Sequence, residues 1–192
     1  HEGFTTYTET VFIECVKGYD EAIKYVNGQS RSVRNDRPVI AQFGVNKEGS
    51  GDMYYKGALM LNTIRHIIND DAKWWKLLYN YSETYKKQII DTKTVIDYFN
   101  KESGLDLTSV FNQYLTTTKI PKLVLSKTGN KLSYEWQNVN TDFKMPVDIV
   151  INEKTIRLHP TTSKQETKID KKIKLENIQV KTNQFFIKVE KK

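Results

Sequence analysis

Apolar residues in the first 118 positions recur at steps of three and four, which is the period of an amphipathic α-helix. The clearest stripe is Trp74, Leu77, Leu78, Tyr81 and Tyr85. Similar stripes predict helices over residues 2–17, 20–26, 57–69, 74–85, 91–103 and 107–115. Residues 29–52 are instead rich in Gly, Ser, Asn, Asp and Arg, and they predict a long irregular loop.

After Thr118 the period of the apolar positions changes to two, the period of a β-strand. The pattern predicts strands around Leu123–Leu125, Leu132–Trp136, Val147–Ile151, Ile156–Leu158, Ile173–Leu175 and Phe186. Turn residues separate some of these runs, at 128–130 and 152–154. The sequence therefore predicts an α+β chain with a helical part at 1–118 and a small β-sandwich domain at 119–192.

The net charge of +7 is unevenly distributed. Residues 1–118 hold 14 Lys and Arg against 15 Asp and Glu, whereas residues 119–192 hold 16 against 8. A basic domain suits nucleic acid or an anionic membrane surface. These lysines mostly alternate with apolar residues, as solvent-facing strand positions do, and no aromatic-basic signature accompanies them. We therefore expect no nucleic-acid partner, and no apolar run is long enough for a transmembrane segment.

Cysteine and histidine offer little conventional site chemistry. Cys15 is the only cysteine and lies in an apolar stretch, so a buried, inert thiol is expected. The three histidines are His1, His66 and His159, and their spacing excludes a paired-histidine metal motif. We expect His66 to be a packed or surface residue of its helix.

Two short motifs carry the candidate chemistry. The first is His1-Glu2-Gly3-Phe4-Thr5-Thr6-Tyr7-Thr8-Glu9, in which Glu2 and Glu9 lie two helical turns apart and share a face. Taken alone, two such carboxylates favour a solvated surface. The second is Met53-Tyr54-Tyr55-Lys56-Gly57-Ala58, whose tyrosine pair taken alone favours packing.

In this order and spacing, the two motifs resemble those of gluzincin zinc aminopeptidases of the aminopeptidase N type. The resemblance implies that Glu2 is the third protein ligand of Zn²⁺. It implies that Tyr54 is catalytic, donating a hydrogen bond to the oxygen that becomes negative. Glu9 would help to hold a ligand or the helix pair in place. Tyr55 stands where many relatives have Glu, and Gly57 is expected to allow a close helix approach.

Further segments extend the resemblance to about residue 160, among them 70–75, 111–116, 119–121 and 145–147. The chain is therefore expected to supply the helical second half of a thermolysin-like catalytic domain, followed by the β-sandwich. Two family motifs are absent from the sequence: the His-Glu-x-x-His zinc helix and the Gly-x-Met-Glu-Asn segment that grips the substrate amine. The chain resembles a C-terminal fragment truncated after the zinc helix.

The resemblance implies a parent protein that binds Zn²⁺ and peptide substrates, with the upstream part of the same protein as partner of this chain. The isolated chain is expected to lack zinc and to be inactive. Three alternatives stay open: a non-catalytic module binding protein or glycan, a basic domain for anionic surfaces, and a catalytically dead relative. The compartment also stays open, although Lys- and Asn-rich strands are typical of an exported bacterial protein, periplasmic or at the cell surface.

Overall fold

A computed structural model describes residues 1–42 and 44–192. Six α-helices come first: α1 (Glu2–Lys17), α2 (Tyr19–Gly28), α3 (Tyr55–Ile68), α4 (Asp71–Tyr85), α5 (Thr92–Ser103) and α6 (Thr108–Thr116). Short 3-10 helices η1 (Gln29–Ser32) and η2 (Gly51–Met53) border the predicted loop. All six predicted helices are confirmed, and residue 43 of the loop lies outside the described residues.

Local capping explains why these helix boundaries were predictable. Before α4 the Asp70 carboxylate accepts a hydrogen bond from the Lys73 amide at 2.9 Å, and before α5 Asp91 accepts from Thr94 at 2.7 Å. Helix α5 ends at Gly104, whose φ of 73° lies in the left-handed region. These signals are local in sequence, so they need no tertiary information.

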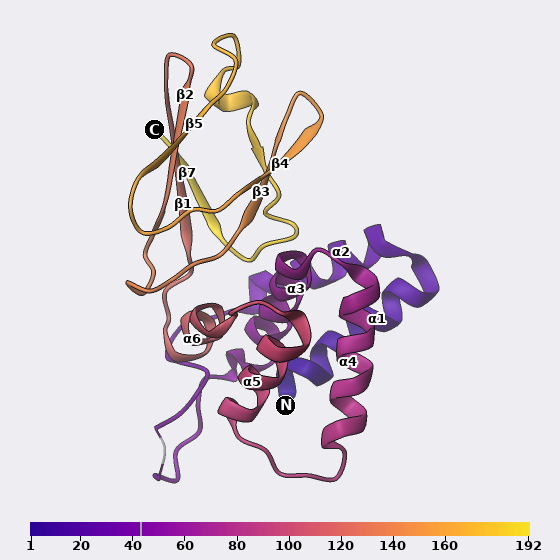
Figure 1. The fold of residues 1–192 in the computed structure, drawn as a ribbon. Coiled ribbons are helices and arrows are strands. Elements are labelled where there is room, and N and C mark those ends of the chain that lie inside the picture. The colour runs from indigo at the N-terminus through magenta and orange to yellow at the C-terminus, as the bar shows by residue number, and fades with distance from the viewer. Residues whose placement is uncertain (43) are drawn as a thin grey trace.

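Seven strands follow: β1 (Lys122–Thr128), β2 (Lys131–Gln137), β3 (Val147–Ile151), β4 (Lys154–Leu158), β5 (Gln165–Lys168), β6 (Gln179–Val180) and β7 (Lys188–Lys191), with the 3-10 helix η3 (Leu175–Asn177) before β6. They form a four-stranded sheet ordered β5-β2-β1-β7 and a three-stranded sheet ordered β4-β3-β6. The strands stand together at one end of the molecule and the helices at the other (Figure 1). The predicted α+β fold is confirmed.

The strands differ from the prediction at positions where an apolar residue packs against the core but belongs to no strand. Leu175 opens the η3 turn rather than a strand, and Phe186 precedes β7. Ile156, expected to point inward, is 39% exposed. The polar strand β5 and the two-residue β6 were missed, because neither carries alternating apolar residues. The turn at Asn152-Glu153 is confirmed, with left-handed φ at both residues.

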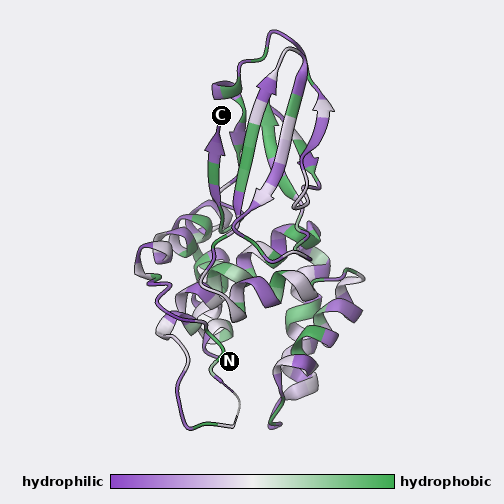
Figure 2. Ribbon diagram, turned by 90° about the vertical axis from the view of Figure 1, so that its left-hand side faces the viewer, coloured by the Kyte–Doolittle hydropathy of each residue, from purple (hydrophilic) through white to green (hydrophobic). Residues whose placement is uncertain are grey.

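One continuous hydrophobic core runs through both parts of the molecule. It includes Trp74, Phe99 and Phe111 from the helices and Leu123 and Trp136 from the sheet. Along the strands, hydrophobic and hydrophilic stretches follow one another (Figure 2). The division at residues 118 and 119 stays a prediction, although helices end at Thr116 and strands begin at Lys122. In the described residues we find no helix with the length and apolar content needed to cross a bilayer.

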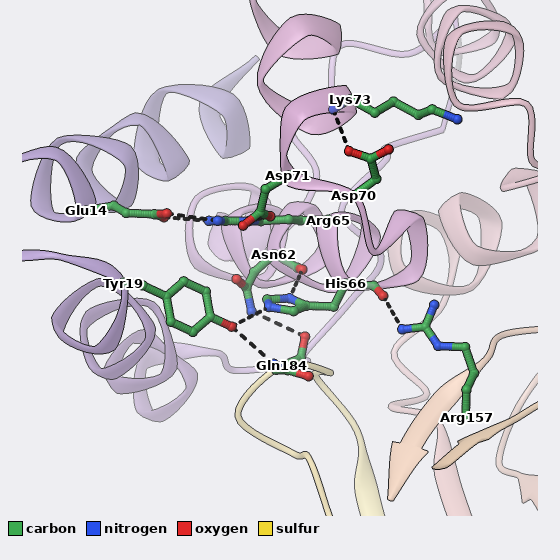
Figure 3. Close-up of polar contacts among 10 residues, drawn as sticks. All are labelled: Glu14, Tyr19, Asn62, Arg65, His66, Asp70, Asp71, Lys73, Arg157 and Gln184. Atoms are coloured by element: carbon green, nitrogen blue, oxygen red, sulfur yellow. Dashed lines mark hydrogen bonds and ion pairs between the residues drawn. The ribbon is translucent and has the colours of Figure 1, made fainter. Parts of the chain in front are cut away.

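The expectation of a buried Cys15 near the end of α1 was wrong. Tyr7 and Thr10 are buried against the core, whereas Cys15 is exposed. The cause is an ion pair on the inner side of α1, where Glu14 binds the buried Arg65 of α3 through two hydrogen bonds, one of 2.8 Å (Figure 3). A carboxylate thus takes an inward position that hydrophobicity alone assigns to apolar residues.

His66 of α3 joins the helices to a loop of the β part (Figure 3). Its Nδ1–H donates to the Asn62 carbonyl at 2.7 Å, so in the neutral ring Nε2 accepts from the Tyr19 hydroxyl at 2.9 Å. Gln184 donates to the same hydroxyl oxygen at 3.1 Å. Burial lowers the pKa of His66 to about 4, so its imidazole is neutral at pH 7. Of the two placements expected for His66, packed or at the surface, the structure shows the packed one.

This burial makes stability depend on pH. The unfolded chain protonates His66 near its ordinary pKa of about 6.5 while the folded chain does not, so stability falls as pH drops from about 6.5 to 4. The contribution lost by pH 4 is about 3 kcal/mol. Urea unfolding at pH 7, 5.5 and 4 measures the free energy of unfolding. Between pH 7 and pH 4 it should fall by about 3 kcal/mol less in His66→Gln than in the wild type. Parallel pH profiles for the two proteins would contradict the assignment.

Candidate functional site

The two candidate motifs meet where α1 crosses α3. A Cβ atom added to Gly3 would lie 2.8 Å from the Gly57 Cα and 3.1 Å from the Met53 carbonyl oxygen. Such distances require both positions to lack side chains. The expectation that Gly57 permits a close helix approach is confirmed, and the partner helix is α1. The crossing brings the backbone next to Glu2 against the backbone next to Tyr54.

The segment before Tyr54 is anchored by a buried carboxylate that sequence reasoning missed. Asp52, 2% exposed, accepts hydrogen bonds from the backbone amides of Arg34 and Asn35 at 2.8 and 2.7 Å. Ser50 caps the η2 turn by accepting from the Asp52 amide at 3.2 Å. Part of the predicted loop is therefore tied to the start of α3. The only sequence feature that pointed to this anchor was an acidic residue shortly before the tyrosine pair.

A second buried group fixes the other side of this helix start. Lys56 is 1% exposed, and its Nζ donates to the Thr117 carbonyl oxygen at 2.7 Å. Burial lowers the pKa of Lys56, opposed by the negative charge of Asp52. Nothing in the sequence pattern assigns this lysine a role. In the structure it ties the beginning of α3 to the chain just after α6.

Glu2 lies at the first turn of α1, beside an apolar cavity of about 250 Å³. Its carboxylate is 2.7 Å from the His1 ring nitrogen, and 26% of its side chain is exposed. Apolar residues of α3, α5, α6 and η2 and of the segment before η2 line the cavity, among them Val39, Met53, Val95 and Phe111. A carboxylate at the edge of an apolar cavity is well placed to accept a hydrogen bond or bind a cation.

Tyr54 and Glu9 line one groove together, between α1, α2 and the start of α3. Tyr54 is 43% exposed, so its phenol is accessible to solvent. The Glu9 carboxylate accepts a hydrogen bond of 2.5 Å from the hydroxyl of Tyr25, another residue that sequence reasoning missed. This hydrogen bond, together with burial, raises the pKa of Tyr25. Glu9 is thus held by the helix next to its own.

The structure brings the predicted residues to neighbouring hollows rather than to one. Glu2 borders the apolar cavity, whereas Tyr54 borders the groove that contains Glu9. Within residues 1–42 and 44–192 no three His, Cys, Asp or Glu side chains gather closely enough to hold a metal ion. A zinc ion needs about three protein ligands, so the described residues supply at most part of such a site.

Comparison with known proteins finds a solved structure with a similar fold. No protein-family model matches the chain, and no curated protein matches it either. Among solved structures, the chain is similar to Legionella pneumophila aminopeptidase A, crystallised in complex with aspartic acid, with a TM-score of 0.70 and 13% sequence identity. The match covers 98% of this chain and 23% of that one.

The chain therefore has the fold of part of an aminopeptidase. It spans about a quarter of the length of that relative, over both the helices and the strands. At this identity the likeness concerns the fold alone.

The glycine crossing gives a direct test of how the site is built. Gly3→Ala should lower the free energy of unfolding by about 1–3 kcal/mol, because its Cβ meets backbone atoms that cannot move independently. Gly28→Ala is the matched control, since Gly28 is helical and nothing lies within 4 Å of its added Cβ. That change should be neutral or stabilising by up to about 1 kcal/mol. Equal effects in urea unfolding would exclude the close contact.

Proposed function

We propose that this chain is part of a zinc metallopeptidase that removes amino-terminal residues from peptides, of the gluzincin aminopeptidase N type. The observation that carries the proposal is the contact between Gly3 and Gly57, which joins the two motif segments at one place. The aminopeptidase fold of the chain supports it. The chain would supply the helical second half of the catalytic domain and the β-sandwich behind it, and the parent protein would supply the remainder.

Three residues of this chain would act in the parent. Glu2 would be one protein ligand of Zn²⁺, its negative charge reducing the net charge of the ion while leaving a coordination position open. The ion would supply Lewis acidity for hydrolysis of the peptide bond. Tyr54 would donate its hydroxyl proton in a hydrogen bond to the oxygen that becomes negative during attack. Glu9, held by Tyr25, would keep a neighbouring ligand or helix in place.

Paired variants of the parent test these roles. Glu2→Ala should remove stoichiometric zinc, because a ligand is lost. Tyr54→Phe should retain zinc and lower kcat by about 10²–10³-fold, as expected for removal of one oxyanion donor. Tyr55→Phe is the control, since Tyr55 is similarly exposed at 40%, and its activity should be unchanged. Metal analysis and peptide hydrolysis measure both effects. Unaltered function in both Glu2→Ala and Tyr54→Phe would favour a non-catalytic module or a dead relative.

The isolated 192-residue chain should neither retain zinc through dialysis nor hydrolyse peptides. One carboxylate cannot replace two imidazoles, and the described residues hold no cluster of three metal-binding side chains. Metal analysis after dialysis and an aminopeptidase assay on the purified chain check this. Stoichiometric zinc or measurable hydrolysis would show that the chain carries a complete site of another kind.

A further inference from the structure

The end of the β part that lies away from the helices carries a cluster of lysines. It consists of two segments, residues 126–131, where β1 turns into β2, and residues 168–174, which begin at the last residue of β5. Both segments lie at the top of the molecule in Figure 1. We call them the basic tip. Its charged residues are Lys127, Lys131, Lys168, Asp170, Lys171, Lys172 and Lys174.

Contacts within the β part hold the two segments of the basic tip side by side. The pairing of β2 with β5 places Lys131 directly opposite Lys168. The ammonium group of Lys127 donates to the carbonyl oxygen of Lys171 at 3.2 Å, although these residues are 44 positions apart in the sequence. The fold therefore gathers at one place the positive charges of two separate stretches of the chain.

The chain neutralises only part of this charge. Lys131 binds the carboxylate of Glu166 at 2.9 Å, and Lys174 lies 3.8 Å from the carboxylate of Glu176. With Asp170 counted as well, three carboxylates face six lysines. An excess of three positive charges therefore remains at this end of the molecule.

The excess is concentrated on Lys168, Lys171 and Lys172. All three side chains are exposed, and over the described residues none of them forms an ion pair with a carboxylate. Asp170 shapes the turn between them, because its carboxylate accepts a hydrogen bond from the Lys172 backbone amide at 2.9 Å. Equal charges held close together repel each other, so packing within the chain does not account for this arrangement, and an external anion would relieve it.

We propose that the basic tip binds the surface of an anionic lipid bilayer. The tip contains no aromatic ring on which the bases of a single strand could stack, and no arginine for bidentate phosphate contacts. Attraction to anionic headgroups needs neither, since each lysine near such a surface strengthens binding roughly fivefold. A planar surface can also touch both segments of a protruding end at once. Binding of this kind requires none of the candidate residues Glu2, Glu9 and Tyr54.

The uneven charge of the chain sets the orientation on the bilayer. The helical part holds 14 Lys and Arg against 15 Asp and Glu, so it is not attracted to an anionic surface. Strand β1, with seven residues, spans roughly 23 Å between the tip and the helices. This span exceeds the Debye length of about 8 Å at physiological salt, so the surface acts on the tip and hardly on the helices.

Co-sedimentation with lipid vesicles tests the proposal on this chain. The tip variant replaces the three uncompensated lysines by glutamine: Lys168→Gln, Lys171→Gln and Lys172→Gln. The control variant makes the same change in net charge at three exposed lysines of the helical part: Lys17→Gln, Lys47→Gln and Lys76→Gln. Vesicles of phosphatidylcholine with about a third phosphatidylserine should bind the wild type and the control alike, and the tip variant about 10²-fold more weakly.

Three further measurements make the outcome decisive. Urea unfolding should give the same stability for all three proteins, so that weaker binding reports the lost charges. Raising the salt to about 0.5 M should remove the binding of the wild type, because the attraction is screened. Equal binding by the two variants, or equal binding of the wild type to vesicles of phosphatidylcholine alone, would overturn the proposal. Tighter binding of a DNA duplex than of the anionic vesicles would assign the tip to a soluble polyanion and overturn it as well.

Discussion

The contact between Gly3 and Gly57 is the constraint on which the candidate site depends. Both motifs are short, and each could occupy a solvated surface if the other were elsewhere. Two missing side chains allow α1 and α3 to touch at their first turns, where the Met53 carbonyl also lies. Asp52 and Lys56 then fix the beginning of α3 from two sides through hydrogen bonds to Arg34, Asn35 and Thr117. The positions of the two motif segments are thus set by a backbone contact and by buried polar side chains, without any contribution from a metal.

The rotation of α1 about its axis is set by a different interaction. Arg65 is 2% exposed, binds Glu14 and Asp71, and lies 4.6 Å from the ring centre of Trp75. Removing one partner of a buried pair costs about 3–5 kcal/mol, so the pair resists rotation strongly even where its net contribution to stability is small. With Glu14 facing inward, Glu9 lies in the groove beside Tyr25, whereas Glu2 borders the apolar cavity at the start of the helix. The same ion pair therefore helps to set the direction in which the side chain of the candidate ligand Glu2 points.

The sequence was informative where the determining forces are local. Helix boundaries at Asp70, Asp91 and Gly104 follow from caps, and the change of period after Thr118 marks the change from helices to strands. Cys15 was assigned to the core because the inward position of Glu14 depends on an arginine 51 residues away. Asp52 and Tyr25 were missed for the same reason, since their partners are set by the packed structure. For the candidate site, the sequence predicted Glu2, Glu9 and Tyr54, and their division between two neighbouring hollows became visible only in the fold.

The strands lie at the end of α3 away from the candidate site. Arg157 of β4 donates to the carbonyl oxygens of His66 and Ile67 at 2.7 and 3.1 Å, where the partial negative charge of a helix end favours a cation. Tyr54 precedes the other end of this 14-residue helix, roughly 20 Å away. The β part holds α3 in place through Arg157, through the Tyr19, His66 and Gln184 contacts, and through the Phe186 amide, which donates to the Thr63 hydroxyl. The excess of lysines belongs to the strand-bearing half, whereas the candidate residues Glu2, Glu9 and Tyr54 belong to the helical half.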